Sequence, residues 1–167
     1  MPANLYIASA GPEQIPLIQE LTLRVWPQTY ASILSDEQIA YMLDQMYSTQ
    51  ALLRQMEEGD VFCIAWQAST PLGFASFGLT DEAGTWQLHK LYVRTDAQQT
   101  GAGKALLWHV CDSVKTQGAT SLILQVNRQN ERAVLFYERM GFHKQRAADF
   151  DIGNNFRMED YVMELVF

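Results

Sequence analysis

The chain has 167 residues, 48% of them hydrophobic and 19% charged, a composition typical of one folded domain (1–167) and not of a disordered chain. Its formal net charge of −7 argues against nucleic acid as the main partner, because that binding requires a basic surface. The apolar runs are too short to cross a bilayer, and the first residues lack the pattern of a signal peptide. We therefore expect a cytoplasmic protein without a membrane partner. Cys63 and Cys111 lack metal-ligand spacing, so we expect reduced core thiols and no metal.

The first third of the chain predicts a strand followed by helices. Residues 5–8 form a short apolar run, and the apolar positions between Leu17 and Val25 then follow helical spacing. Pro27 is expected to end or kink this helix, because proline has no N–H for the helical ladder. The segment beginning at Ser35 resembles a cap for a second helix, and residues 48–58 predict a third.

The remainder predicts a sheet with two further helices. Apolar runs separated by turns indicate an antiparallel meander of three strands, at residues 61–66, 72–79 and 85–93. Next come a helix, a strand, a helix and two final strands, over residues 103–117, 121–126, 130–140, 142–152 and 160–166, with a loop at 153–159. This order predicts an α/β fold in which helices flank a mixed, mostly antiparallel sheet of about seven strands with a parallel crossover at its centre.

The turn between residues 91 and 104 leads from a strand into a helix and contains Gly101 and Gly103. A helix N-terminus presents unpaired N–H groups and a partial positive charge, and glycine lets phosphate oxygens approach the backbone closely. The turn lacks the glycine and lysine spacing of nucleotide triphosphatases and the third glycine of a dinucleotide fingerprint. For two glycines alone, an ordinary turn remains the alternative to a phosphate site.

A second motif lies downstream, at residues 130–142. Asn130 suits the N-cap of a helix, and Gly141 suits the position after its C-terminus. Between them lie Ala133, Phe136 and Tyr137. A phenol with an unperturbed pKa near ~10 is a neutral proton donor at cellular pH. Tyr137 could instead be only a half-buried aromatic that faces the sheet.

Together the two motifs resemble the signature of the GNAT superfamily of N-acetyltransferases, over roughly residues 72–167. The resemblance implies the acyl-CoA N-acyltransferase fold, with acetyl-CoA as cosubstrate and no metal. It also implies that the strand contacts the pantetheine, through Leu91, Tyr92 and Val93. The turn would hold the pyrophosphate, through Gln98, Gln99, Thr100, Gly101, Ala102, Gly103 and Lys104. The later motif would contact the coenzyme through Asn130, Ala133, Phe136 and Tyr137. Tyr137 would then protonate the departing thiolate.

Acetylation requires an unprotonated amine, so a base is needed. His89 is our candidate, because it lies on the strand expected to hold the pantetheine and its pKa of ~6.5 suits proton relay. A structural role for this histidine, with relay through water, is the alternative. Aromatic residues of the first third would line an acceptor pocket, namely Trp26, Tyr30 and Tyr41; they could equally be core.

The arrangement of aromatic residues and helices in the first half of the chain is similar to that of PaiA-type polyamine acetyltransferases, and so are residues 150–155. That subgroup has a glutamate near the position of His89, so its proton relay does not carry over. The sequence favours a small cationic amine such as a polyamine as acceptor. A protein N-terminus or lysine is the alternative acceptor, and a non-catalytic sensor of coenzyme A is an alternative function. A homodimer is common in the superfamily.

Overall fold

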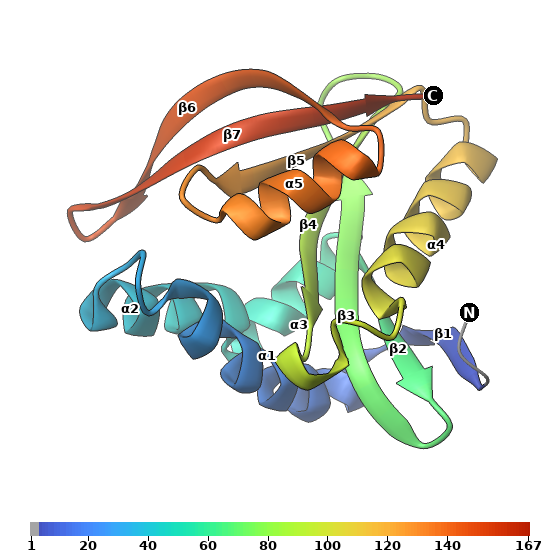
Figure 1. Ribbon diagram of the computed structural model, residues 1–167, viewed down its shortest axis with the longest axis horizontal. Coiled ribbons are helices and arrows are strands. Elements are labelled where there is room, and N and C mark those ends of the chain that lie inside the picture. Colours follow the sequence, from blue (N-terminus) through green and yellow to red (C-terminus); the bar gives the residue numbers. More distant parts are fainter. Residues whose placement is uncertain (1–3) are drawn as a thin grey trace.

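The computed structural model describes residues 4–167 and contains a seven-stranded sheet with helices on both faces (Figure 1). No helix of the described part is long and apolar enough to span a membrane. Two short 3-10 turns, Pro12–Gln14 and Thr95–Ala97, accompany the main elements. The main elements, in chain order, are β1 (Leu5–Ala10), α1 (Ile15–Tyr30), α2 (Asp36–Tyr47), α3 (Thr49–Glu57), β2 (Val61–Gln67), β3 (Thr70–Leu79), β4 (Thr85–Val93), α4 (Ala102–Thr116), β5 (Ser121–Asn127), α5 (Glu131–Arg139), β6 (His143–Gly153) and β7 (Phe156–Val166).

The sheet has the strand order β1-β2-β3-β4-β5-β7-β6 and is antiparallel except between β4 and β5. Helix α4 makes the crossover between these two parallel strands. The predicted fold class, including the meander and the central parallel crossover, is therefore confirmed. The cap predicted at Ser35 is also present, since its hydroxyl accepts a hydrogen bond from the main-chain N–H of Gln38. Ser48 caps α3 in the same way, through the N–H of Ala51.

Successive side chains along each strand point to opposite faces of the sheet, and the apolar side chains therefore form two cores. One core lies between the sheet and α4 and α5, around Leu106, Leu122 and Met163. The other lies between the opposite face and α1 to α3, around Ile18 and Phe74. Each face of the sheet is thus packed by helices.

Strands β4 and β5 pair over only part of their length. The pairs run from Thr85 with Ser121 to Leu88 with Leu124, and beyond these no further pairs join the two strands although both continue. On the other side of β4, Ser76 pairs with Lys90 and the next residue of β3 pairs with Leu88, so His89 is an extra, bulged residue. The bulge lies where the two central strands part.

The structure differs from the sequence expectations at two places. Helix α1 does not end at Pro27 but continues one more turn to Tyr30. Trp26 and Tyr30 are both buried on the core side of that turn, and their packing outweighs the lost hydrogen bond. Because Pro27 has no N–H, the carbonyl of Leu23 has no donor within the helix. Leu23 is 61% exposed, so water can reach this part of the helix.

The second difference concerns residues 153–159, predicted as a loop. Strands β6 and β7 instead form a long hairpin that closes through Asn154 and Asn155, whose φ angles are 54° and 62°. Positive φ at both central residues is the geometry of the tightest hairpin turns, and asparagine tolerates it better than most residues. The hairpin therefore reaches past α2 (Figure 1).

Candidate active site

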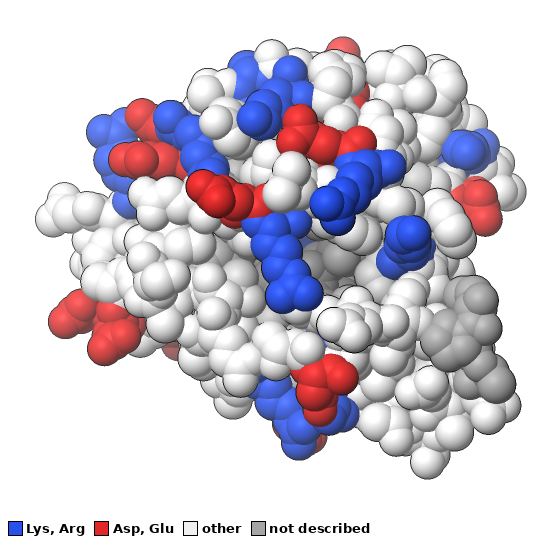
Figure 2. Space-filling view, in the orientation of Figure 1, with Lys and Arg blue, Asp and Glu red and all other residues white. Residues whose placement is uncertain are grey.

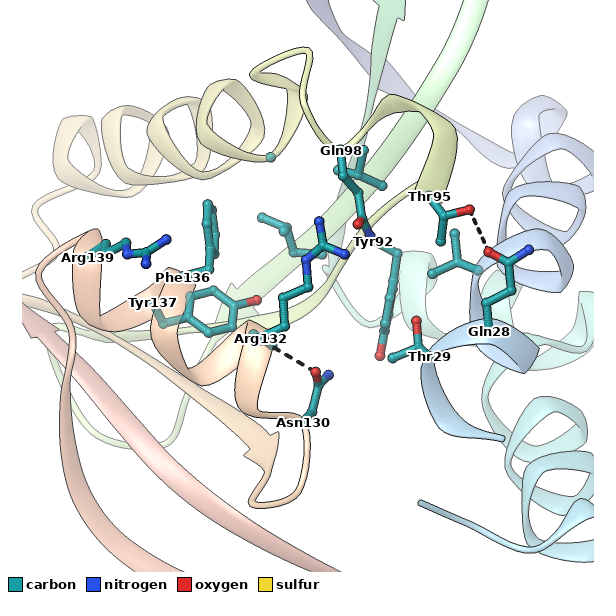
Figure 3. A pocket seen from close by; sticks show the side chains of 15 residues that line it. Gln28, Thr29, Tyr92, Thr95, Gln98, Asn130, Arg132, Phe136, Tyr137 and Arg139 are labelled. Carbon is teal, nitrogen blue, oxygen red and sulfur yellow. Dashed lines mark hydrogen bonds between the residues drawn. The ribbon is translucent and has the colours of Figure 1, made fainter. Parts of the chain in front are cut away.

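A cavity of ≈ 490 Å³ lies between β4, the end of α1 and helix α5. Figure 3 shows its lining, and Figure 2 shows Lys and Arg side chains around a hollow in the middle of the same face. The lining combines main chain of a strand with aromatic, amide and cationic side chains: Val25, Gln28, Thr29, Leu91, Tyr92, Val93, Thr95, Gln98, Gly103, Asn130, Arg132, Ala133, Phe136, Tyr137 and Arg139. Two cationic side chains at its rim suit a ligand that carries several negative charges.

The N-terminus of α4 adjoins this cavity. Gly101 is its N-cap, with a φ of 85° that favours glycine, and no side chain caps the helix. The main-chain N–H groups of Gly101, Gly103 and Lys104 have no acceptor among residues 4–167. A Cβ built on Gly103 would be in van der Waals contact with the ring of Phe136, at 3.6 Å, so the turn and α5 lie close together across this cavity. Free N–H groups at a helix N-terminus are suited to phosphate oxygens.

The edge of β4 forms the adjoining wall. Because β5 pairs only as far as Leu124, the edge of β4 that faces β5 has no strand partner from His89 to Val93. Its main-chain N–H and C=O groups are therefore free to bond an extended ligand that carries amides, as a neighbouring strand would. The described residues thus place a turn with free N–H groups beside an unpaired strand edge, an arrangement suited to the pyrophosphate and pantetheine of coenzyme A.

Helix α5 supplies the opposite wall. Asn130 is its N-cap and accepts a hydrogen bond of 3.4 Å from the N–H of Ala133, as the sequence predicts. Tyr137 is 8% exposed, and its ring packs between Phe136 and Phe142 with centroids 5.3 and 5.5 Å away. Burial raises the pKa of Tyr137, so its hydroxyl is a neutral donor at cellular pH. In Figure 3 this hydroxyl points into the cavity.

A smaller cavity of ≈ 50 Å³ lies where β4 and β5 part, and Tyr30, Tyr92 and Tyr137 all line it. The hydroxyls of Tyr30 and Tyr92 are 3.2 Å apart. Burial is the main reason why the pKa values of both phenols are raised, so they too remain protonated. Phenol hydroxyls at this junction can orient an attacking amine and relay its proton through water.

His89 also lines this smaller cavity. Its Nε2 atom lies 3.4 Å from Oδ1 of Asp60, the residue before β2. Burial lowers the pKa of His89 and Lys90 lowers it further, whereas the negative charge of Asp60 partly opposes both. The imidazole is therefore neutral at cellular pH and able to accept a proton, and Asp60 is placed to orient it.

Other residues predicted for the site lie outside both cavities. Trp26 is 1% exposed and packs behind Tyr30 and Tyr92, with ring centroids 4.6 and 6.0 Å away. Tyr41 donates a hydrogen bond of 2.8 Å to the carbonyl of Ile152 and so fastens α2 to β6. The part of the turn that lines neither cavity comprises Gln99, Thr100, Gly101, Ala102 and Lys104.

Sequence reasoning did not single out Arg132, Arg139 or Asp60. The two arginines are seven residues apart on α5 and share a face with Phe136, so helical spacing from the expected coenzyme contacts could have identified them. Neither arginine forms an ion pair with any residue from 4 to 167. Asp60 could not have been found in this way, because its proximity to His89 depends on how β2, β3 and β4 align.

Comparison with known proteins agrees with this geometry. The sequence model of the acetyltransferase (GNAT) family matches residues 18–142. A spermidine N(1)-acetyltransferase from Thermoplasma acidophilum is 30% identical over 161 residues, which cover 93% of this chain and 96% of that protein. The ribosomal protein bS18-alanine N-acetyltransferase of Salmonella typhimurium is 36% identical over 74 residues, only 42% of this chain and 48% of that enzyme.

Among solved structures, the PaiA N-acetyltransferase of Thermoplasma acidophilum in complex with coenzyme A superposes with a TM-score of 0.81 and 27% identity. The superposition covers 98% of this chain and 99% of that one. The resemblance to PaiA-type enzymes noted from the sequence is confirmed. The match to the family over most of the chain, together with the fold, shows that this protein belongs to the GNAT acetyltransferase family and is an N-acetyltransferase.

Proposed function

We propose that the protein transfers the acetyl group of acetyl-CoA to a primary amine of a small cationic acceptor such as a polyamine. The observation that carries the proposal is the unpartnered edge of β4, which lines one cavity together with Gly103 of α4 and with Tyr137. Pyrophosphate at Gly101 and Gly103, with pantetheine along this edge, would bring the thioester beside Tyr137. The spermidine acetyltransferase relative, which nearly the whole chain matches, supports a polyamine acceptor.

The proposed reaction is direct attack in a ternary complex. The neutral amine attacks the thioester carbonyl, which the main-chain N–H near Leu91 polarises. A carbon–nitrogen bond forms, the carbon–sulfur bond breaks, and the hydroxyl of Tyr137 donates to the departing sulfur. The proton released from the amine passes to His89, directly or through water, while Asp60 orients the imidazole.

The β6–β7 hairpin supports a small acceptor over a peptide. A peptide would need an open groove between the early helices and residues 153–159. This approach is occupied: Gln38 donates a hydrogen bond of 2.9 Å to the carbonyl of Arg157, and the ring centroids of Tyr41 and Phe156 are 5.4 Å apart. These contacts hold α2 against the hairpin and narrow the route by which a chain would enter.

The test is release of free coenzyme A thiol from acetyl-CoA with polyamines, amino acids, aminoglycosides and N-terminal peptides as acceptors. We expect release well above background with spermidine or spermine. Release with a peptide alone would refute the small-amine proposal. No release with any acceptor, while acetyl-CoA still binds in calorimetry, would refute the assigned reaction and favour a binding function.

A further inference from the structure

Lys90 is a buried amine that the reaction scheme does not use. Of the four lysines in the chain, all within the described residues, it is the one that is buried, with 6% of the residue exposed. Its Nζ atom lies 5.0 Å from the ring centroid of Tyr47 and 6.0 Å from that of Phe62, and both rings belong to the core beside α1 to α3. Side chains alternate along a strand, so Lys90 shares this face of β4 with Tyr92.

No carboxylate holds this amine. Lys90 forms no ion pair with any residue from 4 to 167. Asp60 acts on it electrostatically but makes its close contact with His89. Ser76, the strand partner of Lys90 on β3, is fully buried and its Oγ atom has no hydrogen bond. Burying an unpaired ammonium is costly, and the cost falls when the amine is neutral.

Lys90 lines the smaller cavity together with Leu91 and Tyr137. The proposed reaction takes place between these two residues, with the thioester carbonyl at the main-chain N–H near Leu91 and the sulfur at the hydroxyl of Tyr137. Leu91 directly follows Lys90 and lines both cavities. The four-carbon stem of lysine is flexible, so rotation about its bonds would carry Nζ from the aromatic rings toward the thioester.

We propose that Lys90 is a site of self-acetylation, which takes the acetyl group of bound acetyl-CoA when no acceptor is present; this inference rests on the proposed function. The lone pair of the neutral Nζ attacks the thioester carbonyl, so a carbon–nitrogen bond forms and the carbon–sulfur bond breaks. Tyr137 donates its proton to the sulfur and regains one from the nitrogen. The products are an amide on Lys90 and free coenzyme A, and no further reactant is consumed.

The environment of Lys90 favours a nucleophilic amine. Burial lowers its pKa from 10.5 to about 8, and the negative charge of Asp60 opposes this shift. A neutral fraction is therefore present at cellular pH, whereas exposed lysines are almost entirely protonated. Acetylation would remove a positive charge from the wall of the smaller cavity, where it would repel a cationic acceptor.

The experiment incubates the protein with isotopically labelled acetyl-CoA and no acceptor, and maps labelled and pre-existing acetyl groups by tandem mass spectrometry of its peptides. Lys115 and Lys144 are internal controls. Each also lies over an aromatic ring, with Nζ 5.1 and 4.5 Å from the ring centroid, but each is exposed. We expect acetylation of Lys90 to exceed that of both controls by roughly 10-fold or more, because only Lys90 is held beside the thioester.

Tyr137→Phe distinguishes catalysed transfer from chemical acetylation in solution. We expect Lys90 to be labelled roughly ten- to a thousandfold more slowly in this variant, with no change at Lys115 and Lys144. Lys90→Arg keeps the charge but should lose the gain in intact mass. Equal acetylation of Lys90 and the two controls, or an unchanged rate at Lys90 in Tyr137→Phe, would overturn the inference.

Thiol release with free amines tests the proposed function separately. Release with spermidine and no acetyl group on Lys90 would leave that function intact and refute self-acetylation. Acetylated Lys90 without release by any acceptor would support the inference and refute transfer to a small amine. Neither acetylated Lys90 nor release would refute both.

Discussion

His89 lies at the bulge in β4 and Asp60 directly precedes β2, yet the imidazole Nε2 of His89 lies 3.4 Å from Oδ1 of Asp60. The carboxylate raises the pKa of His89 against the larger, opposite effect of burial. The balance of these two effects determines the pH at which the imidazole can accept a proton.

Replacing Asp60 by Asn removes the charge that raises the pKa of His89. The pKa then falls further, so the acidic limb of the kcat/KM profile, where His89 becomes protonated, should move to lower pH. His89→Gln should abolish this limb and lower turnover by about 100-fold. His143→Gln is the control, since His143 lies at the outer strand β6 beside Glu164. An unchanged profile in both His89 and Asp60 variants would show that the proton leaves by another route.

Tyr137→Phe keeps the ring that packs between Phe136 and Phe142 but removes the hydroxyl. We expect turnover to fall by roughly ten- to a thousandfold, because the departing sulfur loses its donor, with little change in coenzyme A affinity. Steady-state kinetics and calorimetry on the same preparation separate the two effects. Turnover equal to that of the wild type would remove Tyr137 from the mechanism.

Gly101→Asp should weaken coenzyme A binding, since the new carboxylate repels phosphate at the N-terminus of α4. The substitution also strains the backbone, because φ is 85° at this position. Gly118→Asp is a matched control: Gly118 follows the other end of α4, has a φ of 87°, and has open space around it. Both variants should lose about 1 kcal/mol of stability, but only Gly101→Asp should lose affinity in calorimetry.

Arg132→Gln should reduce coenzyme A affinity several-fold, on the order of 1 kcal/mol, and the loss should shrink as salt is added. The effect follows from the exposed guanidinium at the rim of the cavity (Figure 3). Arg146→Gln, on the exposed side of β6, removes the same charge far from the cavity. Equal losses in the two variants would mean that net charge, and not a local contact, determines affinity.

Asp160→Asn should stabilise the protein at pH 7. The folded-state pKa of about 6 exceeds the reference value of 3.8, so the folded state holds the proton more tightly. Stability therefore falls as pH rises from about 4 to 6, by up to about 3 kcal/mol. The variant lacks this titration, so its advantage in denaturant melts should be present at pH 7 and absent at pH 3.5. An advantage of equal size at both pH values would show that ionisation is not its cause.

Periodicity and turn chemistry in the sequence were sufficient to predict the strand and helix order and the turn at Gly101. They were not sufficient where long-range packing decides. Pro27 stays helical because Trp26 and Tyr30 anchor the turn around it. Residues 156–159 pair with β6 beyond the end of β5, because Asn154 and Asn155 close a tight turn between the two strands. The contact of His89 with Asp60 depends on one bulged residue of β4. Asp160 lacks an ion pair because Arg128 forms its ion pair with Asp149.

The early end of β4–β5 pairing has a consequence for folding as well as for binding. The protein contains an unfinished sheet with an internal edge, and this edge is shielded from other chains by the helices on both faces. Coenzyme A laid along it would act as a missing strand. Ligand binding would then complete the secondary structure and raise the melting temperature in proportion to the logarithm of ligand concentration. A cell rich in acetyl-CoA would thus hold a more rigid form of this protein than a starved one.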